Sequence, residues 1–472
     1  MRFKRRLGAL RAAAWGACVA MAPLSICPNA RAAQPITVIG APSQTSTNGH
    51  YVFAHYMVAF ATYGETVEGY RQEIMEAQAA NIDGFALNVG AWDDYESYYK
   101  KRVGLMFQAA EQLGTGFKLF FSVDFEVPSN IVSMVQQYAG RPNAFRYQGK
   151  FVLSTYGHQN LDWNTMLAQL RTNGVDVFFI PHFFPPGGGE LPNADNAKAI
   201  LGTYTNLLDG LFLFDPAGTL EETTASTAQY TYVVQQSNKL FMASCTPHYW
   251  GCLQPTLGRR YFETLGGEGT ELQWSQLIAN EPDWVEIVTW NDFHESTYVS
   301  PIINPGRYFD VLVSPRRNTH AGYLELSKYY ITWYKSNQQP AIDRDALFYF
   351  YRIHPMGLVI SNDIPVTTLL GDVQDELFLT TMLKRPAKLV VTSGGVRSQY
   401  DQADGINHVR VPFHVGSQVF EVSRDGSQQL LINAPPVVTT LTNYDFFPTS
   451  GFAYFLDRAA ATPPVRLAPV TW

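Results

Sequence analysis

The chain has 472 residues, of which 46% are hydrophobic and 14% aromatic, and this is enough apolar material for one large and one smaller folded domain. Only 16% of the residues are charged, and no basic run lies beyond the extreme N-terminus, so the composition excludes a disordered chain and a nucleic-acid partner.

Residues 1–32 have the features of a secretory signal peptide. A basic start precedes an apolar stretch over 12–26, and Ala30-Arg31-Ala32 offers the small residues of a cleavage site. The apolar stretch is short for a bilayer span, and no later segment has the roughly 18 to 20 uninterrupted apolar residues that a membrane helix needs. We therefore expect a secreted protein, extracellular or periplasmic, with no membrane contact after the signal is removed.

Removal of this segment changes the charge and the cysteine count. Six of the 34 Lys and Arg residues leave with it, so 28 remain against 41 Asp and Glu, and a formal charge of about −13 favours solubility. Cys18 and Cys27 also leave; lipidation of Cys27 is an alternative that the bulky Ile26 disfavours. Cys245 and Cys252 remain, and in an oxidising compartment we expect them to form one small disulfide loop. A zinc pair is the alternative, but no second Cys or His pair lies nearby at ligand spacing, so no metal or other cofactor is expected.

From residue 51 onward, short apolar runs alternate with longer segments of helical period. Helical period is clear where Val103, Met106, Phe107 and Ala110 share one face before Gly114, and the last predicted helix covers 321–334. The predicted strands are 51–56, 82–89, 117–125, 151–156, 175–184, 209–216, 239–245 and 284–290. Eight strands that are apolar on both faces, each followed by a helix, predict a (β/α)8 TIM-type barrel over 33–337. An open doubly wound sheet is the alternative, but no glycine-rich phosphate-binding motif supports it.

The texture of the sequence changes after residue 338. Short strand candidates follow one another without helical segments, at 347–353, 375–383, 387–393, 417–423 and 428–433, and Asp425-Gly426 indicates a hairpin turn. We expect residues 338–472 to form a C-terminal β-sandwich domain.

Functional side chains of a (β/α)8 barrel project from the C-terminal ends of its strands. Carboxylates mixed with aromatic rings are what a sugar site requires, because the rings stack on pyranose faces and two carboxyl groups supply the acid and the base or nucleophile. Nearly every predicted strand ends in such residues, and the substrate-binding candidates are His55, Tyr56, Asn88, Asp124, Tyr156, His182, Phe183, Asp215, Tyr249, Trp250 and Trp290.

The stretch TWNDFHESTYV, residues 289–299, places Asp292 and Glu295 three residues apart directly after a predicted strand. This D-x-x-E spacing is also that of a helix capping box, and taken alone it favours a cap. Asp83, in IDGF at the start of a predicted strand, is on its own better explained as a turn or salt-bridge residue.

Five stretches together resemble glycoside hydrolase family 71, the α-1,3-glucanases or mutanases: IDGFALNVG (82–90), FKLFFSVDF (117–125), NAFRYQGKFVLSTYG (143–157), FFIPHFF (178–184) and TWNDFHESTYV (289–299). The resemblance runs from about residue 48 to about residue 355 and implies a (β/α)8 barrel, secretion, inversion and hydrolysis of α-1,3-glucan. Its W-N-D-x-x-E-S pattern implies that Asp292 and Glu295 are essential acids, and its D-G-F-A-L-N pattern implies Asp83 as a third. The segment around Cys245, CTPHYWGC, departs from the Ser-Pro-Trp-Phe type expected of the family.

For an inverting reaction we expect Glu295 to be the general acid, because aromatic neighbours would desolvate it, and Asp292 to be the base. The two roles can be exchanged, and Asp83 and Asp124 are alternatives for holding the water. The expected partner is an α-1,3-glucan. We expect the protein to be a monomer that cleaves bonds within the polymer chain. A hydrolase of another α-glycan such as α-mannan, and a non-catalytic glycan-binding protein, are the rival interpretations.

Overall fold

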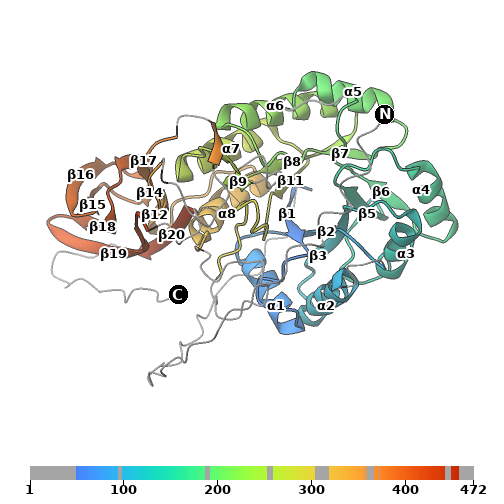
Figure 1. Cartoon of the computed structure of the whole chain (residues 1–472), viewed down its shortest axis with the longest axis horizontal. Helices are drawn as coiled ribbons and strands as arrows, with labels where there is room; N and C mark the ends of the chain where they lie inside the picture. Colours follow the sequence, from blue (N-terminus) through green and yellow to red (C-terminus); the bar gives the residue numbers. More distant parts are fainter. Residues whose placement is uncertain are drawn as a thin grey trace. The chain divides into compact units, whose positions relative to one another are not determined.

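The computed structural model describes residues 49–93, 98–186, 192–251, 259–302, 318–356, 358, 366–370, 373–441 and 448–456 (Figure 1). The predicted signal peptide and Cys252 lie outside these residues. In the part of the chain that is described, no helix is long and apolar enough to cross a membrane.

Strands and helices alternate through the first three hundred residues, as the sequence predicts, and the fold is mixed α/β. The strands are β1 (Tyr51–Met57), β2 (Gly84–Val89), β3 (Lys118–Val123), β5 (Lys150–Thr155), β6 (Val177–Phe179), β7 (Gly210–Phe212), β8 (Leu240–Cys245) and β11 (Trp284–Ile287). The helices that follow them in turn are α1 (Val67–Ala79), α2 (Tyr98–Leu113), α3 (Pro128–Tyr138), α4 (Trp163–Thr172), α5 (Ala194–Tyr204), α6 (Leu220–Gln236), α7 (Gly266–Asn280) and α8 (Ala321–Ser336).

These strands form one curled parallel sheet in the order β6-β5-β3-β2-β1-β11-β8-β7, and the two-residue β4 (Arg146–Tyr147) adds an antiparallel hairpin to β5. The helices lie on its outer face (Figure 1). At the two ends of this order, the Asp209 N–H donates to Phe179 O (2.9 Å) and the Phe212 N–H to Pro181 O (3.0 Å). Strands β6 and β7 therefore approach each other closely.

Side chains divide between two cores because successive residues of a strand point to opposite faces. Phe53, Ala86, Phe120, Phe212 and Trp284 belong to a cluster enclosed by the sheet, and their neighbours in sequence pack against the helices outside it. This alternation decides which strand-end residues reach the inside of the curled sheet.

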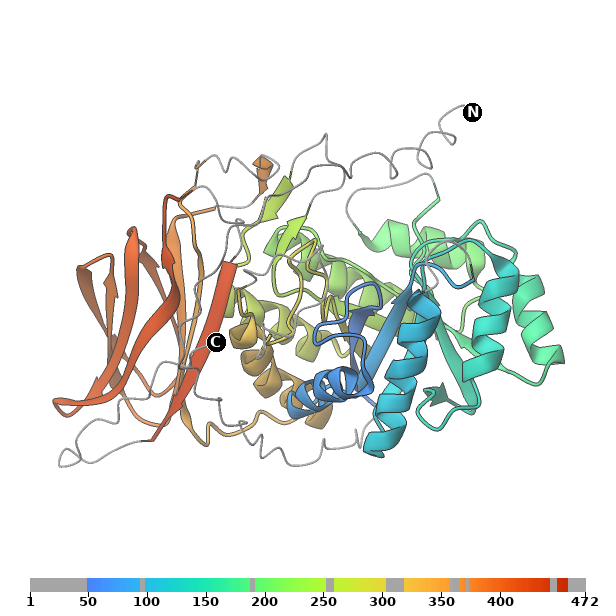
Figure 2. The ribbon, with the colours of Figure 1, turned by 60° about the horizontal axis from the view of Figure 1, so that its bottom comes forward.

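The C-terminal part consists of antiparallel sheets (orange to red in Figure 2). One has the order β17 (Gly405–Pro412), β14 (Glu376–Leu383), β12 (Asp345–Arg352), β20 (Pro448–Phe455); the other has β16 (Val396–Gln402), β15 (Ala387–Ser393), β18 (Gly416–Arg424), β19 (Ser427–Val438). Leu347, Leu379, Leu389 and Phe420, two from each sheet, share one hydrophobic cluster. The predicted hairpin at Asp425-Gly426 is confirmed, since both residues have positive φ between β18 and β19.

A small fourth sheet joins the two parts of the sequence. Strand β10 (Arg259–Phe262) pairs with β9 (Tyr249–Gly251) and with β13 (Val366–Leu370). The β9 and β10 pair brings Tyr249 and Arg260 beside the turn that follows β11.

Candidate active site

Trp290 and Asn291 attach the turn after β11 to β1. The Trp290 N–H donates to His55 O (2.8 Å). The Asn291 side chain accepts the Met57 N–H (2.7 Å) and donates to Met57 O (3.1 Å). Two backbone hydrogen bonds close the base of the turn. The Thr289 N–H donates to Thr297 O, and the Val299 N–H donates to Thr289 O. Its position at the C-terminal end of the sheet is therefore defined by hydrogen bonds rather than by the chain direction alone.

Asp292 has the geometry of a turn cap. Its Oδ1 accepts the N–H groups of His294 and Glu295, both at 2.9 Å, while its own N–H donates to Thr289 Oγ1 (2.7 Å). The capping role that the D-x-x-E spacing allows is thus present in the structure. The same contacts hold the carboxylate in one orientation next to Glu295.

Glu295 is the group with the most suitable acidity for a general acid. The Tyr249 hydroxyl donates to its Oε1 (3.3 Å), and Trp250 N–H donates to its backbone oxygen (2.8 Å). Burial and the negative charge of Asp292 raise the pKa of Glu295 to about 8, and the Tyr249 hydrogen bond and the Arg260 charge offset only part of that. A carboxyl group that keeps its proton near neutral pH can donate it to a leaving oxygen.

An aromatic wall lies at the ends of β5, β6 and β7. The Tyr156 and His182 rings are stacked with centroids 5.5 Å apart, and Phe184 and Phe214 stand edge-on to Tyr156 at 5.6 and 5.0 Å. Burial, helped by the negative charges of Glu295 and Asp124, raises the pKa of Tyr156 to about 12. Tyr156 therefore keeps its hydroxyl proton in the field of both carboxylates.

His182 is neutral in this wall. Burial lowers its pKa to about 4, and the Phe214 N–H donates to its Nδ1 (3.1 Å). A neutral, partly hydrogen-bonded imidazole is suited to contacting a sugar hydroxyl.

The rim beyond Tyr156 carries Asp124, Glu126 and His158. The His158 ring lies 3.5 Å from Asp124 Oδ1 through Nε2 and 3.5 Å from Glu126 Oε1 through Nδ1. The neighbouring carboxylates of Asp124 and Glu126 raise the pKa of His158. His158 is not marked by any motif; its only signal in the sequence is its place two residues after the strand-end Tyr156.

The floor of the site is a buried pair on β1 and β11, His55 Nδ1 and Glu286 Oε1, 2.6 Å apart. Burial raises the pKa of Glu286. Asn88 lies two residues further along β2 than Ala86, which is the residue that pairs with His55. The signal for Glu286 was available, since it is the one charged residue inside the apolar run WVEIVTW.

Three of the expected substrate-binding residues point away from this site. The Tyr56 hydroxyl and the Trp290 Nε1–H both donate to Glu73 of α1, and Phe183 packs against Tyr204 of α5 with ring centroids 4.9 Å apart. Tyr56 and Phe183 directly follow His55 and His182, so their side chains point to the other face of the sheet. The Trp290 side chain points toward α1. Phe184, in contrast, has a side chain that is 41% exposed and contacts the Tyr156 ring.

Asp83 lies at the other end of the sheet. It precedes β2, accepts the Val52 N–H on Oδ2 (2.9 Å) and pairs through Oδ1 with Lys335 Nζ of α8 (2.8 Å). This buried ion pair joins β1, β2 and α8, so Asp83 has the salt-bridge role that its local sequence favours, and it does not accompany Asp292 and Glu295.

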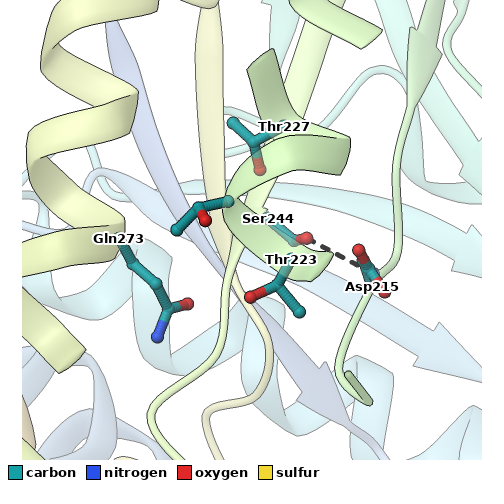
Figure 3. A pocket seen from close by; sticks show the side chains of 6 residues that line it. Asp215, Thr223, Thr227, Ser244 and Gln273 are labelled. Atoms are coloured by element: carbon teal, nitrogen blue, oxygen red, sulfur yellow. Dashed lines mark hydrogen bonds between the residues drawn. The ribbon is translucent and has the colours of Figure 1, made fainter. Parts of the chain in front are cut away.

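Asp215 also faces outward, under α6 (Figure 3). Its N–H donates to Ser244 Oγ (3.3 Å), and its Oδ2 has no hydrogen-bond partner among the described residues. Together with Thr223, Thr227 and Gln273 it lines a cavity of about 10 Å³, which has room for about one water molecule. Burial raises its pKa to about 7.

Trp250 and Cys245 are structural in this geometry. The Trp250 ring is buried against Tyr261 (centroids 5.8 Å apart), and Trp250 contacts Glu295 through its backbone N–H. Cys245 is buried and is bonded to no other cysteine among the described residues, and burial raises the pKa of its thiol to about 12. Because Cys252 lies outside the described residues, the disulfide stays a prediction. Among the residues that are described, no group of three His, Cys, Asp or Glu side chains is arranged to hold a metal ion.

A protonated carboxyl next to a fixed carboxylate, with stacked aromatic rings and hydroxyl-binding groups around them, is the equipment of a glycoside hydrolase. Residues 48–452 match the sequence profile of glycosyl hydrolase family 71, and the chain belongs to that family.

Relatives with assigned names agree with this class. The chain is 30% identical over 387 residues to a mutanase of Penicillium rubens, a match that covers 80% of this chain and 82% of the relative. It is 26% identical over 431 residues to a glucan endo-1,3-alpha-glucosidase of Schizosaccharomyces pombe, covering 86% and 95%. A solved family 99 endo-alpha-mannosidase from Bacteroides thetaiotaomicron aligns with a TM-score of 0.47 at 17% identity, over 62% of this chain and 99% of that one.

Proposed function

We propose that this protein hydrolyses internal α-1,3-glucosidic bonds of α-1,3-glucan with inversion of configuration. The observation that carries the proposal is Glu295, whose pKa is raised to about 8 beside Asp292 at the carboxyl end of the sheet. The name of the matched Schizosaccharomyces pombe relative, a glucan endo-1,3-alpha-glucosidase, supports the choice of linkage.

In the proposed reaction Glu295 donates its proton to the glycosidic oxygen as the bond to the anomeric carbon breaks. Asp292 takes a proton from a water molecule that attacks the opposite face of the same carbon, so the new hydroxyl has the inverted configuration. Asp292 Oδ1 is held by two amide groups, which leaves Oδ2 to receive that proton. Exchange of protons with solvent then restores both groups.

The surroundings have separate tasks. Tyr156, Phe184 and Phe214 offer ring faces and edges to the glucose units, and His182 and Asp124 offer hydrogen-bonding atoms to their hydroxyls. No step requires a metal or an organic cofactor.

We also propose a domain organisation and a location for the protein. Residues 33–337 form a closed (β/α)8 barrel, a reading supported by the backbone hydrogen bonds between β6 and β7. Residues 338–472 form a β-sandwich, supported by the hydrophobic cluster that its two sheets share. Residues 1–32 direct secretion, and N-terminal sequencing of the exported protein tests this, with Ala33 expected as its first residue. The mature protein acts as a monomer, which its elution volume in gel filtration tests.

The first experiment is reducing-sugar release from insoluble α-1,3-glucan, with dextran, starch and yeast α-mannan as controls and Glu295→Gln beside the wild type. We expect release from the α-1,3 polymer alone and its loss in the variant. A short-time product spectrum of mixed oligosaccharides would support internal attack, and the anomeric NMR signal of the first product reports inversion. Cleavage of a control polymer instead, or binding without release, would overturn the assignment.

A further inference from the structure

Glu73 is a carboxyl group buried between helix α1 and the sheet. Its side chain is fully inaccessible to solvent, yet both of its oxygens are used: Oε1 accepts the Tyr56 hydroxyl (2.9 Å) and Oε2 accepts the Trp290 Nε1–H (2.8 Å). The two donors come from β1 and from the first residues of the turn that carries Asp292 and Glu295. Helix α1, blue in Figure 2, is thereby joined to the catalytic turn.

Three contacts of Trp290 attach the turn to β1, β2 and α1. Trp290 is held by its N–H on His55 O, by its ring against Phe85 (centroids 5.2 Å apart) and by the indole hydrogen bond to Glu73. Trp290 is two residues before Asp292, so a shift of its ring moves the backbone on which both catalytic carboxyl groups stand.

A buried carboxyl is a costly way to fill this space. Taking an ionisable group out of water is unfavourable, and an apolar side chain of the same size would pack without that desolvation penalty. Burial raises the pKa of Glu73 to about 7, with hydrogen bonds from Thr62, Trp290 and Tyr56 opposing the rise. A carboxylate accepts from both the indole and the phenol, whereas a glutamine has one acceptor oxygen and takes the present acceptor away from one of these two donors.

The same helix contains a matched comparison. Glu76, three residues later, is also buried, and burial raises its pKa to about 8. Its oxygens accept from the Tyr63 hydroxyl (3.0 and 2.9 Å) and from Gln72 Nε2 (3.0 Å). These partners belong to α1 and to the loop before it, and neither is part of the catalytic turn.

We propose that Glu73 is a positioning residue for the hydrolytic reaction, which acts through the Trp290 indole to hold the Asp292 and Glu295 carboxyl groups in their working arrangement. This inference rests on the proposed function of the turn. Glu73 itself lies behind the sheet and contacts no substrate.

The test compares Glu73→Gln with Glu76→Gln, using a soluble α-1,3-linked gluco-oligosaccharide. We expect kcat of E73Q to fall between about tenfold and a hundredfold with KM changed less than about threefold, because misplacement of a catalytic group affects the transition state and not ground-state binding. E76Q should keep kcat within about threefold at equal loss of thermal stability. Equal losses of kcat in both variants, or wild-type kcat in E73Q, would overturn the proposal.

A second readout does not depend on activity. The amides of His294 and Glu295 donate to Asp292 Oδ1, so hydrogen–deuterium exchange of 290–299 reports whether the turn is held. Exchange should be faster in E73Q and unchanged in E76Q; equal exchange in the two variants would contradict the role. Faster exchange in E73Q together with a wild type that leaves α-1,3-linked sugars intact would reject the proposed function and retain the attachment.

A double-mutant cycle isolates the contact. Trp290→Phe removes the indole donor and keeps an aromatic ring, so W290F and E73Q should each lower kcat and the double variant should lower it no further than the more severe of the two. Additive losses would show that Glu73 acts by another route and would overturn the proposal.

Discussion

Tyr249 donates its phenolic hydrogen to Glu295 Oε1 over 3.3 Å and accepts a hydrogen bond from Arg260 Nη2 over the same distance. The small sheet of β9 and β10 thus contacts the Glu295 side chain through this hydroxyl group, beside the backbone hydrogen bond from Trp250 to Glu295 O. A donor to a carboxyl favours its ionised form, so Tyr249 lowers the pKa of Glu295 while burial and Asp292 raise it.

Tyr249→Phe should move the alkaline limb of the activity profile. Without the phenolic donor, the pKa of Glu295 rises further above about 8, and the general acid keeps its proton to higher pH. We expect the limb to shift upward by up to about one pH unit, the equivalent of one hydrogen bond. The measurement is kcat/KM between pH 5 and 10 on a soluble α-1,3-linked oligosaccharide; a limb that stays in place or moves down would exclude this coupling.

Phe183 and Phe184 should respond oppositely to truncation. Phe184→Ala removes an exposed ring beside Tyr156 and should raise KM about tenfold with little change in thermal stability. Phe183→Ala empties a buried position and should cost about 3 to 5 kcal/mol of unfolding free energy, with KM of the remaining folded protein unchanged. Urea unfolding and initial rates on both variants separate the two, and a raised KM in F183A would reverse the assignment.

Asp83→Asn tests whether the carboxyl at the other end of the sheet takes part in the reaction. The substitution leaves Lys335 buried without its partner, so we expect a loss of about 3 to 5 kcal/mol in stability. Well below the melting temperature kcat should stay within about twofold of wild type. The double variant D83N/K335M should recover part of the stability. A kcat reduced as far as that of E295Q would instead place Asp83 in the catalytic machinery.

Asp215→Asn should flatten the dependence of stability on pH. The pKa of Asp215 in the folded protein is about 7, above its ordinary value of 3.8, so the folded state binds more protons and the free energy of unfolding falls as pH rises through this window. The contribution is on the order of 3 to 4 kcal/mol between pH 4 and 8. Urea unfolding at pH 5 and pH 8 should show a smaller difference in D215N than in wild type; equal differences would mean that the carboxyl is not perturbed.

Much of the architecture follows from the sequence. The eight runs from 51–56 to 284–290 each contain a strand of the curled parallel sheet, because an apolar run of this length between helical segments has few other ways to bury both faces. Strands β16 and β17 were not predicted; their side chains are mostly exposed or half-buried and polar, so the apolar signal that identifies a strand is weak there.

The sequence also predicted the turn that carries Asp292 and Glu295. Its D-x-x-E spacing indicates the local cap that the structure shows, and the resemblance to family 71, not the spacing, implies a catalytic role for the two carboxyl groups. Only the tertiary structure decided which strand-end side chains share a site with them. Tyr56, Phe183 and Asp215 each stand one residue away from an inward-facing position, and Asp83 stands at the opposite end of its strand. The physical reason is the two-residue period of a strand: a shift of one position sends a side chain to the other face, and composition and motif spacing do not record that register.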